Sequence, residues 1–135
     1  MEALPLRLSP GADLRAALEA EVAARSLRAS FVISGIGSLS EARLRLAGVD
    51  EPNHLQGDLE ILTLSGTIAV NGSHLHMSVA DSSGRVMGGH VSRGCIVRTT
   101  AEVLLLLLPD WSFDREFDPA TGFAELVVSR RDGVA

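Results

Sequence analysis

The sequence predicts a protein of the α/β (α+β) class, with a mostly antiparallel β-sheet and one main flanking helix. Three observations indicate this class. Asn71-Gly72 separates two strand-like runs, which is a strong hairpin signal. Residues 13–26 have the apolar spacing of an amphipathic helix, and residues 95–108 form a long run rich in leucine and β-branched residues. At 135 residues, the chain is expected to form a single domain over 1–135.

The first 26 residues predict an edge strand followed by the helix. Leu4 to Leu8 alternates in polarity, and Pro5 would confine this strand to a sheet edge because proline cannot donate a ladder hydrogen bond. After a break at Pro10-Gly11, Asp13 or a neighbour caps a helix that ends near Ser26. We expect this helix to cover the sheet with one apolar stripe, formed by Leu14, Ala17, Leu18 and Val22.

Residues 29–58 predict two strands and a loop. The segments 29–33 and 41–46 have strand character, and Gly35-Ile36-Gly37 interrupts them. These glycines do not complete a dinucleotide-binding fingerprint, because the third glycine and the following helix are missing, so they indicate a bend or bulge. Residues 47–58 are polar and contain Pro52 and Gly57, which predicts a loop.

The hairpin around Asn71-Gly72 defines two faces. If these residues form a type I′ turn, Val70 pairs with Ser73, and the strands run over 59–70 and 73–80. Because side chains alternate along a strand, one face is apolar and packs on the core. The opposite face is small and hydroxylated, and it carries two histidines one residue apart, His74 and His76.

The remaining residues predict further strands. Residues 85–87 form a short strand, after which Gly88-Gly89 leads to His90. Residues 95–108 predict a long central strand whose apolar residues on both faces require cover on both. An irregular stretch, a last strand and a frayed tail are expected over 111–122, 123–129 and 130–135.

Charge and cysteine content limit the classes of partner. The formal net charge is −5, and the 12 cationic side chains are all arginines. This balance argues against a broad surface for nucleic acid or anionic membrane, and it leaves a local arginine patch open. The longest apolar run, 103–108, is far shorter than the roughly 20 residues that span a bilayer. A single Cys95, expected to be buried, and the absence of a signal-peptide pattern in residues 1–11 predict a cytoplasmic protein.

His74, His76 and His90 are the candidate metal ligands. An H-x-H pair on one strand places both rings on one face, about 7 Å apart at Cα. Zinc and other divalent transition metals accept neutral imidazole nitrogens, and catalytic sites often combine three protein ligands with an open position. Gly88-Gly89 gives the backbone the freedom to deliver the third ring. The alternative is a solvated strand face that happens to carry histidines.

Two further residues are candidate helpers of this cluster. Thr67, expected opposite His76, is a candidate to orient a ring by hydrogen bonding. Glu102 lies on the long apolar strand, where an unpaired carboxylate would be costly to bury. It is expected to orient a histidine, to bind the ion directly, or to pair with an arginine such as Arg98.

Six segments occur in an order that is specific as a set: Gly35-Ile-Gly-Ser-Leu, Leu59-Glu-Ile-Leu, Leu64-Ser-Gly-Thr-Ile, His74-Leu-His, Gly84-Arg-Val-Met-Gly-Gly-His90 and Val97-Arg-Thr-Thr-Ala-Glu102. Together they resemble the plants-and-prokaryotes-conserved (PPC) domain, over a core of about residues 6–128. The resemblance implies a compact domain with a mostly antiparallel sheet and a flanking helix, assembled as a homotrimer. It also implies a metal site at His74, His76 and His90.

The resemblance carries implications for partners. Plant members accompany AT-hook segments in nuclear DNA-binding proteins, whereas this sequence contains no AT-hook. A family segment tied to partner contacts in plants, Gly-Arg-Phe-Glu-Ile-Leu, appears here as Gly57-Asp-Leu-Glu-Ile-Leu62, with Asp58 and Leu59 in place of arginine and phenylalanine. The matching positions are candidate contacts for a protein partner such as a transcription factor, namely Gly57, Glu60, Ile61 and Leu62.

Three functions stay open. The first is a DNA-binding or transcription-associated regulatory module, although arginines scattered among more numerous acids predict weak or no direct duplex binding. The second is a metal-dependent enzyme or small-molecule-binding protein, in which the ion serves lyase or hydrolase chemistry. The third is a trimeric scaffold for protein partners, which the apolar strand 103–108 favours.

Overall fold

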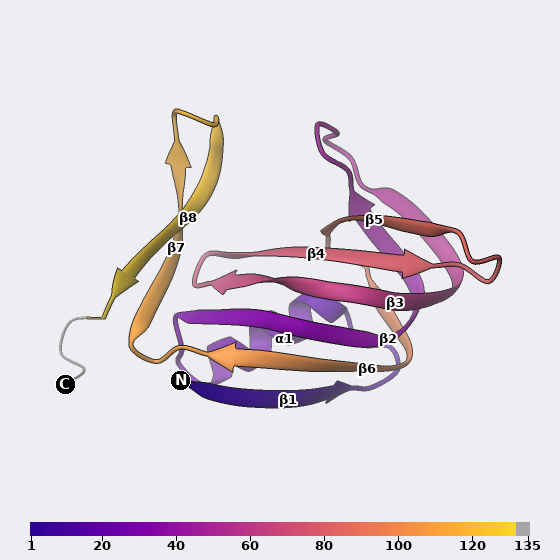
Figure 1. Ribbon diagram of the computed structural model, residues 1–135, viewed down its shortest axis with the longest axis horizontal. Coiled ribbons are helices and arrows are strands. Elements are labelled where there is room, and N and C mark those ends of the chain that lie inside the picture. Colours follow the sequence, from indigo (N-terminus) through magenta and orange to yellow (C-terminus); the bar gives the residue numbers. More distant parts are fainter. Residues whose placement is uncertain (132–135) are drawn as a thin grey trace.

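A computed structural model describes residues 1–131, which form one helix and eight strands (Figure 1). In chain order these are β1 (Glu2–Leu8), α1 (Leu14–Ala24), β2 (Ala29–Arg45), β3 (Asn53–Ala69), β4 (Gly72–Ala80), β5 (Val86–Val91), β6 (Ile96–Leu107), β7 (Trp111–Asp118) and β8 (Phe123–Arg130). The predicted class is confirmed, because these elements make a single compact domain with a mostly antiparallel sheet and one helix.

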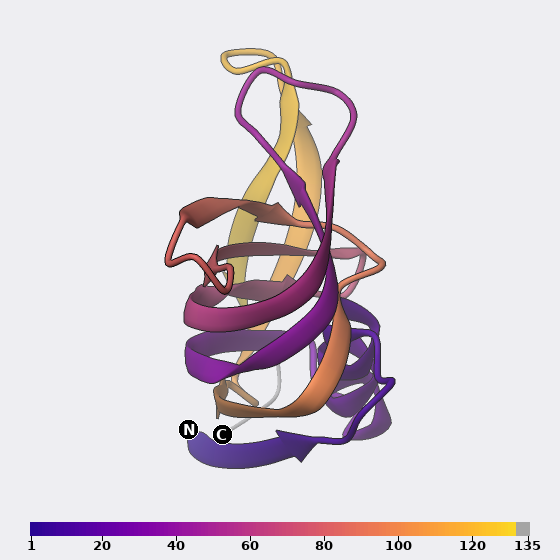
Figure 2. The same cartoon turned by 90° about the vertical axis from the view of Figure 1, so that its right-hand side faces the viewer.

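The main sheet has six strands in the order β1-β6-β2-β3-β4-β5, and all of its pairings are antiparallel. β2 also pairs with β5, through Leu44 with Val91 and Arg45 with His90. This extra pairing closes β2, β3, β4 and β5 into a ring, and the strong curvature of these strands is visible in Figure 2. As a result, the end of β5 lies beside both β4 and the end of β2.

Helix α1 covers the inner face of the sheet (Figure 1). Its N-cap is Asp13, as predicted, and Oδ1 of Asp13 accepts a hydrogen bond from Ala16 N at 3.0 Å, which satisfies one of the free N–H groups of the first turn. The buried stripe of Leu14, Leu18 and Val22 is also as predicted. Within residues 1–131, no helix is long and apolar enough to cross a membrane.

β6 is an interior strand, as predicted, and β1 with its Pro5 is the edge strand beside it. Val103, Leu105 and Leu107 are buried in the core. The opposite face of this part of the sheet remains apolar and exposed within the described chain, although cover was expected on both faces of β6. Its large exposed side chains include Phe31, Ile33, Ile36 and Leu104, at 38%, 49%, 55% and 38%.

Two segments predicted to interrupt strands lie within strands; the bulge expected at Gly35–Gly37 is confirmed, but the break there and the loop over 53–58 were wrong. β2 runs without a break through Gly35–Gly37, and shifts in its pairing with β6 on either side mark this region as bulged. β3 begins at Asn53 instead of residue 59, and His54 Nε2 lies 2.9 Å from Glu41 Oε2 across the pair. The ends of β2 and β3 project as an arm above the sheet (Figure 2). At its base Leu55 packs against the core, while the polar residues beside it are exposed, so this part of β3 is a half-buried strand.

The segment 111–122 is not irregular, which is a further correction. Its first eight residues form β7 and pair with β8, the predicted last strand, as a separate hairpin (Figure 1). Phe113 is 2% exposed and packs with Ala29 and Ala69, whereas the charged residues between the aromatic ones obscure the strand pattern. Of the predicted tail, Arg130 belongs to β8, and residues 132–135 lie outside the described part of the chain.

Candidate metal centre

β4 presents two histidines on its outward face. Leu75 and Met77 are each 2% exposed and lie in the core, while His74 and His76 alternate with them and are exposed. The predicted division of this hairpin into an apolar face and a histidine face is therefore confirmed, because side chains alternate strictly along a regular strand.

The predicted register of β3 with β4 was wrong by two residues. Ala69 pairs with Gly72, so Val70 and Asn71 make the turn, and Thr67 faces His74 instead of His76. The reason lies in the β7–β8 hairpin: Val70 N donates to Phe113 O, and the Asn71 side chain bonds the backbone of Arg115. A shift of two residues preserves both faces, so the position of the histidines does not change sides.

His90 is delivered by strand pairing. Gly88 and Gly89 are regular members of β5, opposite Ser78 and Met77, and His90 directly faces His76. The expectation that Gly88-Gly89 bends the backbone toward His90 was therefore wrong, because both glycines lie in an extended, paired strand. Gly89 serves close packing instead, because a Cβ there would lie 2.8 Å from Arg45 O on β2.

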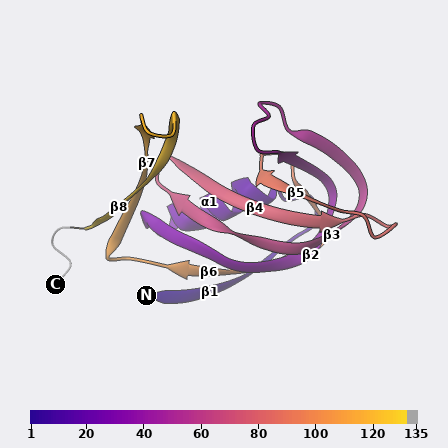
Figure 3. The ribbon, with the colours of Figure 1, turned by 45° about the horizontal axis from the view of Figure 1, so that its top comes forward.

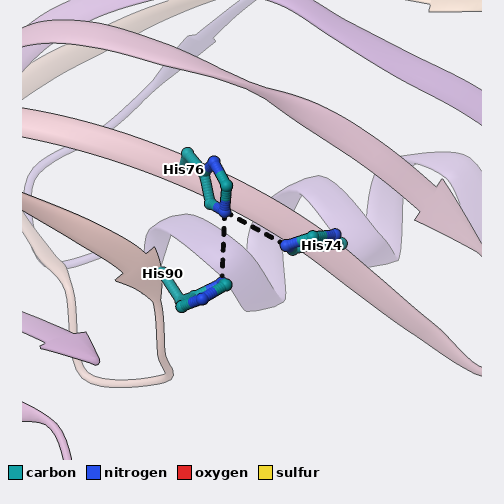
Figure 4. A group of neighbouring side chains, drawn as sticks. All are labelled: His74, His76 and His90. Atoms are coloured by element: carbon teal, nitrogen blue, oxygen red, sulfur yellow. Dashed lines mark hydrogen bonds between the residues drawn. The ribbon is translucent and has the colours of Figure 1, made fainter. Parts of the chain in front are cut away.

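The three rings converge on one point (Figure 4). His74 Nε2 lies 3.1 Å from His76 Nε2, which lies 3.2 Å from His90 Nδ1. All three ligand atoms fall within 4.8 Å of one another. Two nitrogens bound tetrahedrally to zinc at about 2.0–2.1 Å would be roughly 3.3–3.4 Å apart. The two distances to His76, 3.1 and 3.2 Å, match this value, and a bound ion would draw the nitrogens of His74 and His90 closer together.

Hydrogen bonding alone accounts poorly for this arrangement. A ring nitrogen of neutral histidine carries either one proton or one lone pair. His76 Nε2 nevertheless has two nitrogen neighbours at hydrogen-bond distance. Three lone pairs that point at a shared ion satisfy all of these contacts together.

The electrostatic surroundings favour neutral rings at two of the three positions. Burial lowers the pKa of His74 below its ordinary 6.5, and the Arg115 guanidinium and the neighbouring rings add to this effect. Burial likewise lowers the pKa of His90, with Arg45 and His76 as further causes. Neutral imidazole is the form that binds a metal ion, so these shifts favour ligation near neutral pH.

A model of the Plants and Prokaryotes Conserved (PCC) domain matches residues 1–109. The chain belongs to this family. PCC and PPC denote the same domain, so the resemblance found in the sequence is confirmed. A bifunctional protein GlmU from Synechococcus sp. strain JA-3-3Ab is 48% identical over 126 residues, which are 93% of this chain and 20% of that protein. The PCC chain thus spans about a fifth of the curated relatives it matches.

Solved structures share the fold of this PCC domain. A hypothetical protein from Salmonella cholerae-suis matches with a TM-score of 0.93 at 38% identity, covering 96% of this chain and 94% of the other. A metal-containing protein from Archaeoglobus fulgidus matches with a TM-score of 0.79 at 26% identity, covering 94% of each. A protein from Bacteroides thetaiotaomicron, named provisionally as DNA-binding, has a TM-score of 0.83 at 20% identity, covers 93% and 91%, and supports the fold alone.

Of the two residues predicted to support the histidine cluster, Thr67 lies beside it in the PCC domain and Glu102 does not. Glu102 on β6 is exposed and pairs with Arg7 and Ile36, and two strands, β2 and β3, separate β6 from β4. It is not in the group of converging ligands, and the ion pair of Arg98 is with Asp58. Thr67 does lie beside His74, but its hydroxyl accepts a hydrogen bond from Arg115 Nη2 at 3.2 Å.

The candidate partner segment lies in β3. Ile61 is 3% exposed and belongs to the core of this chain, whereas Glu60 and Leu62 point outward and are exposed. Gly57 is exposed as well. Of these residues, only Gly57, Glu60 and Leu62 are therefore accessible on the described chain.

Sequence reasoning missed two arginines beside the centre. Arg45 is the β2 partner of His90, and Arg115 lies on β7, which was expected to be irregular. Each acts on the pKa of a neighbouring histidine, Arg45 on His90 and Arg115 on His74. The alternating charges of 41–46 could have placed Arg45 on an outward face, but nothing in the sequence links Arg115 to β4.

Proposed function

We propose that this PCC domain binds a divalent transition metal, zinc in the first instance, through Nε2 of His74, Nε2 of His76 and Nδ1 of His90. The convergence of the three nitrogens, at 3.1 and 3.2 Å along the cluster, is the observation that carries the proposal. The name of the Archaeoglobus neighbour, a metal-containing protein, supports it. When bound, such an ion supplies Lewis acidity, and three protein ligands leave room for a small molecule.

Metal analysis of purified protein tests this function. Wild type is expected to carry an equimolar amount of zinc after reconstitution and dialysis, and His74→Ala and His90→Ala are expected to lose most of it. His54→Ala is the matched control, because His54 contacts Glu41 on the β2–β3 arm and is outside the cluster. Equal metal content in wild type and in the two cluster variants would eliminate the site.

We also propose that the domain assembles as a homotrimer through the exposed apolar face of β2 and β6. Large side chains on that face, among them Ile33 and Leu104, would lose contact with water on association. Light scattering is expected to give three times the 14.3 kDa chain mass. Ile33→Glu should shift the protein toward monomer, whereas Val86→Glu, at an exposed position on β5, should not. A monomeric wild type would contradict the proposal.

Regulation in association with DNA is a second candidate function, favoured by the provisional name of the Bacteroides neighbour. Five arginines already pair with carboxylates, namely Arg15, Arg25, Arg28, Arg93 and Arg98. Together with the net charge of −5, these pairs make direct phosphate binding weak, so a protein partner at Gly57–Leu62 would provide the association. We expect no gel shift of duplex DNA at physiological salt. Tight binding that weakens steeply with salt would contradict this expectation.

A further inference from the structure

A cavity of about 520 Å³ borders the three-histidine cluster at His74 and His90. β4 and β5 cross between the β7–β8 hairpin and the arm formed by the ends of β2 and β3 (Figure 3). The cavity lies in this region, and its wall includes His74 and His90 as well as residues of the hairpin and of the loop after β2. A volume of this size is in the range of pockets that hold small molecules.

The wall of this cavity carries an excess of positive charge. Arg15, Arg45, Arg115 and Glu125 all line it. Arg15 is neutralised by Glu19, at 3.0 Å, but Arg45 and Arg115 form no ion pair with a carboxylate among residues 1–131. Glu125 accepts a hydrogen bond from Thr121 Oγ1 at 2.9 Å. The residues of the wall therefore include two arginines without a carboxylate partner and one glutamate, in a chain whose net charge is −5.

Both unpaired arginines are held near the histidines by the fold. Arg45 is the strand partner of His90, and its Nη1 donates to Val49 O at 3.3 Å in the following loop. Arg115 donates to Thr67, the strand partner of His74, while Asn71 holds its backbone. The two guanidinium groups thus come to the cavity from different elements, one beside His90 and one beside His74.

We propose that this cavity binds a small organic molecule bearing a carboxylate or phosphate group, held by Arg45 and Arg115 beside the three-histidine centre. This inference deepens the metal-binding function proposed above and rests on it. Guanidinium groups recognise both oxyanions through paired N–H donors, and their positive charge adds to that of a bound divalent ion. A cationic cavity in an acidic chain selects for an anionic ligand, because an uncharged or cationic molecule would leave these charges without a counterion.

Calorimetric titration of zinc-loaded full-length protein tests the proposal, with malonate and inorganic phosphate as the two probes. Wild type is expected to bind at least one of them, and the preferred probe distinguishes carboxylate from phosphate. The double variant Arg45→Gln/Arg115→Gln should bind that probe at least about tenfold more weakly, since each guanidinium contributes a charged hydrogen bond. The control is Arg98→Gln, because Arg98 pairs with Asp58 on another part of the sheet; it should bind as wild type does.

Metal content, measured on each sample, separates this inference from the metal site itself. If the double variant keeps its zinc and binds the probe as tightly as wild type, the inference is overturned and the metal site stands. The inference is also overturned if wild type binds neither probe more tightly than about 10 mM. If wild type holds no zinc but still binds a probe in a manner that depends on the two arginines, the metal-binding function fails and the anion site stands.

Discussion

The side-chain amide of Asn71 holds the backbone of Arg115 at both ends: Nδ2 donates to Arg115 O at 2.9 Å, and Oδ1 accepts from Arg115 N at 2.8 Å. These contacts join the β3–β4 turn to the β7–β8 hairpin. Neither Val70 nor Asn71 takes the left-handed conformation that both central residues of a type I′ turn require. Asn71 therefore sets the hairpin register and the place of a guanidinium beside His74.

Asn71→Ala should loosen the β7–β8 hairpin while leaving the metal site intact. Loss of two hydrogen bonds is expected to lower the local opening free energy of the hairpin by about 1–3 kcal/mol. Hydrogen exchange of β7 amides measures this change, with Asn53→Ala at the exposed start of β3 as the control. Unchanged protection of β7 in Asn71→Ala would show that these contacts do not hold the hairpin.

The metal-free protein should lose stability as the pH falls from about 6.5. Burial lowers the pKa values of His74 and His90 below the ordinary 6.5, so the unfolded chain takes up these protons before the folded chain does. In that window the unfolded state binds more protons, and the free energy of unfolding decreases with decreasing pH. Thermal unfolding measured between pH 8 and pH 5 checks this. The decrease in the free energy of unfolding per pH unit should be smaller in the double variant His74→Gln/His90→Gln. An equal slope in that variant would mean that other groups are responsible.

Gly66 should resist substitution far more than Gly57, although both are glycines of β3 with positive φ, 147° and 126°. A Cβ on Gly66 would lie 2.0 Å from the carbonyl oxygen of His74, whereas none of the atoms near Gly57 would come within 4 Å. Gly57→Ala is expected to cost about 1–2 kcal/mol of unfolding free energy from backbone strain alone, and Gly66→Ala at least about 4 kcal/mol because the clash adds to the strain. Urea unfolding of both variants measures the difference. Similar losses would contradict the close approach of β3 to His74.

Glu125→Gln should strengthen binding of an anion in the cavity. Glu125 lines the cavity, and its charge partly opposes the lowering of the His74 pKa, so it lies close enough to repel an anionic ligand there. Removal of one partly screened charge is expected to increase probe affinity about two- to fivefold in zinc-loaded protein. The titration described for wild type measures it. A weaker affinity in Glu125→Gln would show that the carboxylate helps to bind the ligand.

Local patterns correctly predicted the features that are set by residues within a single segment. Asp13 and the stripe through Leu14, Leu18 and Val22 identified α1, because capping and a 3.6-residue period are features of a single segment. The shared face of His74 and His76 follows from strand alternation alone and was also predicted.

The remaining errors all concern contacts between distant segments. The β3–β4 register depends on Asn71 meeting Arg115, which lies 44 residues away. In β7, Phe113 packs against Ala29 and Ala69, which lie on β2 and β3. The sequence of residues 111–118 does not indicate this packing. Glu102 was proposed as a helper because it shares a strand with apolar residues, but the order of strands places it away from the rings. These are tertiary effects that one sequence read locally does not contain.

Anomalous diffraction at the zinc edge, from crystals of the zinc-loaded protein, tests the central claim most directly. The account predicts a peak between the three rings, with Nε2 of His74, Nε2 of His76 and Nδ1 of His90 about 2.0–2.1 Å from the ion. A peak at the His54–Glu41 pair instead, or an empty position between rings that have moved apart, would contradict it.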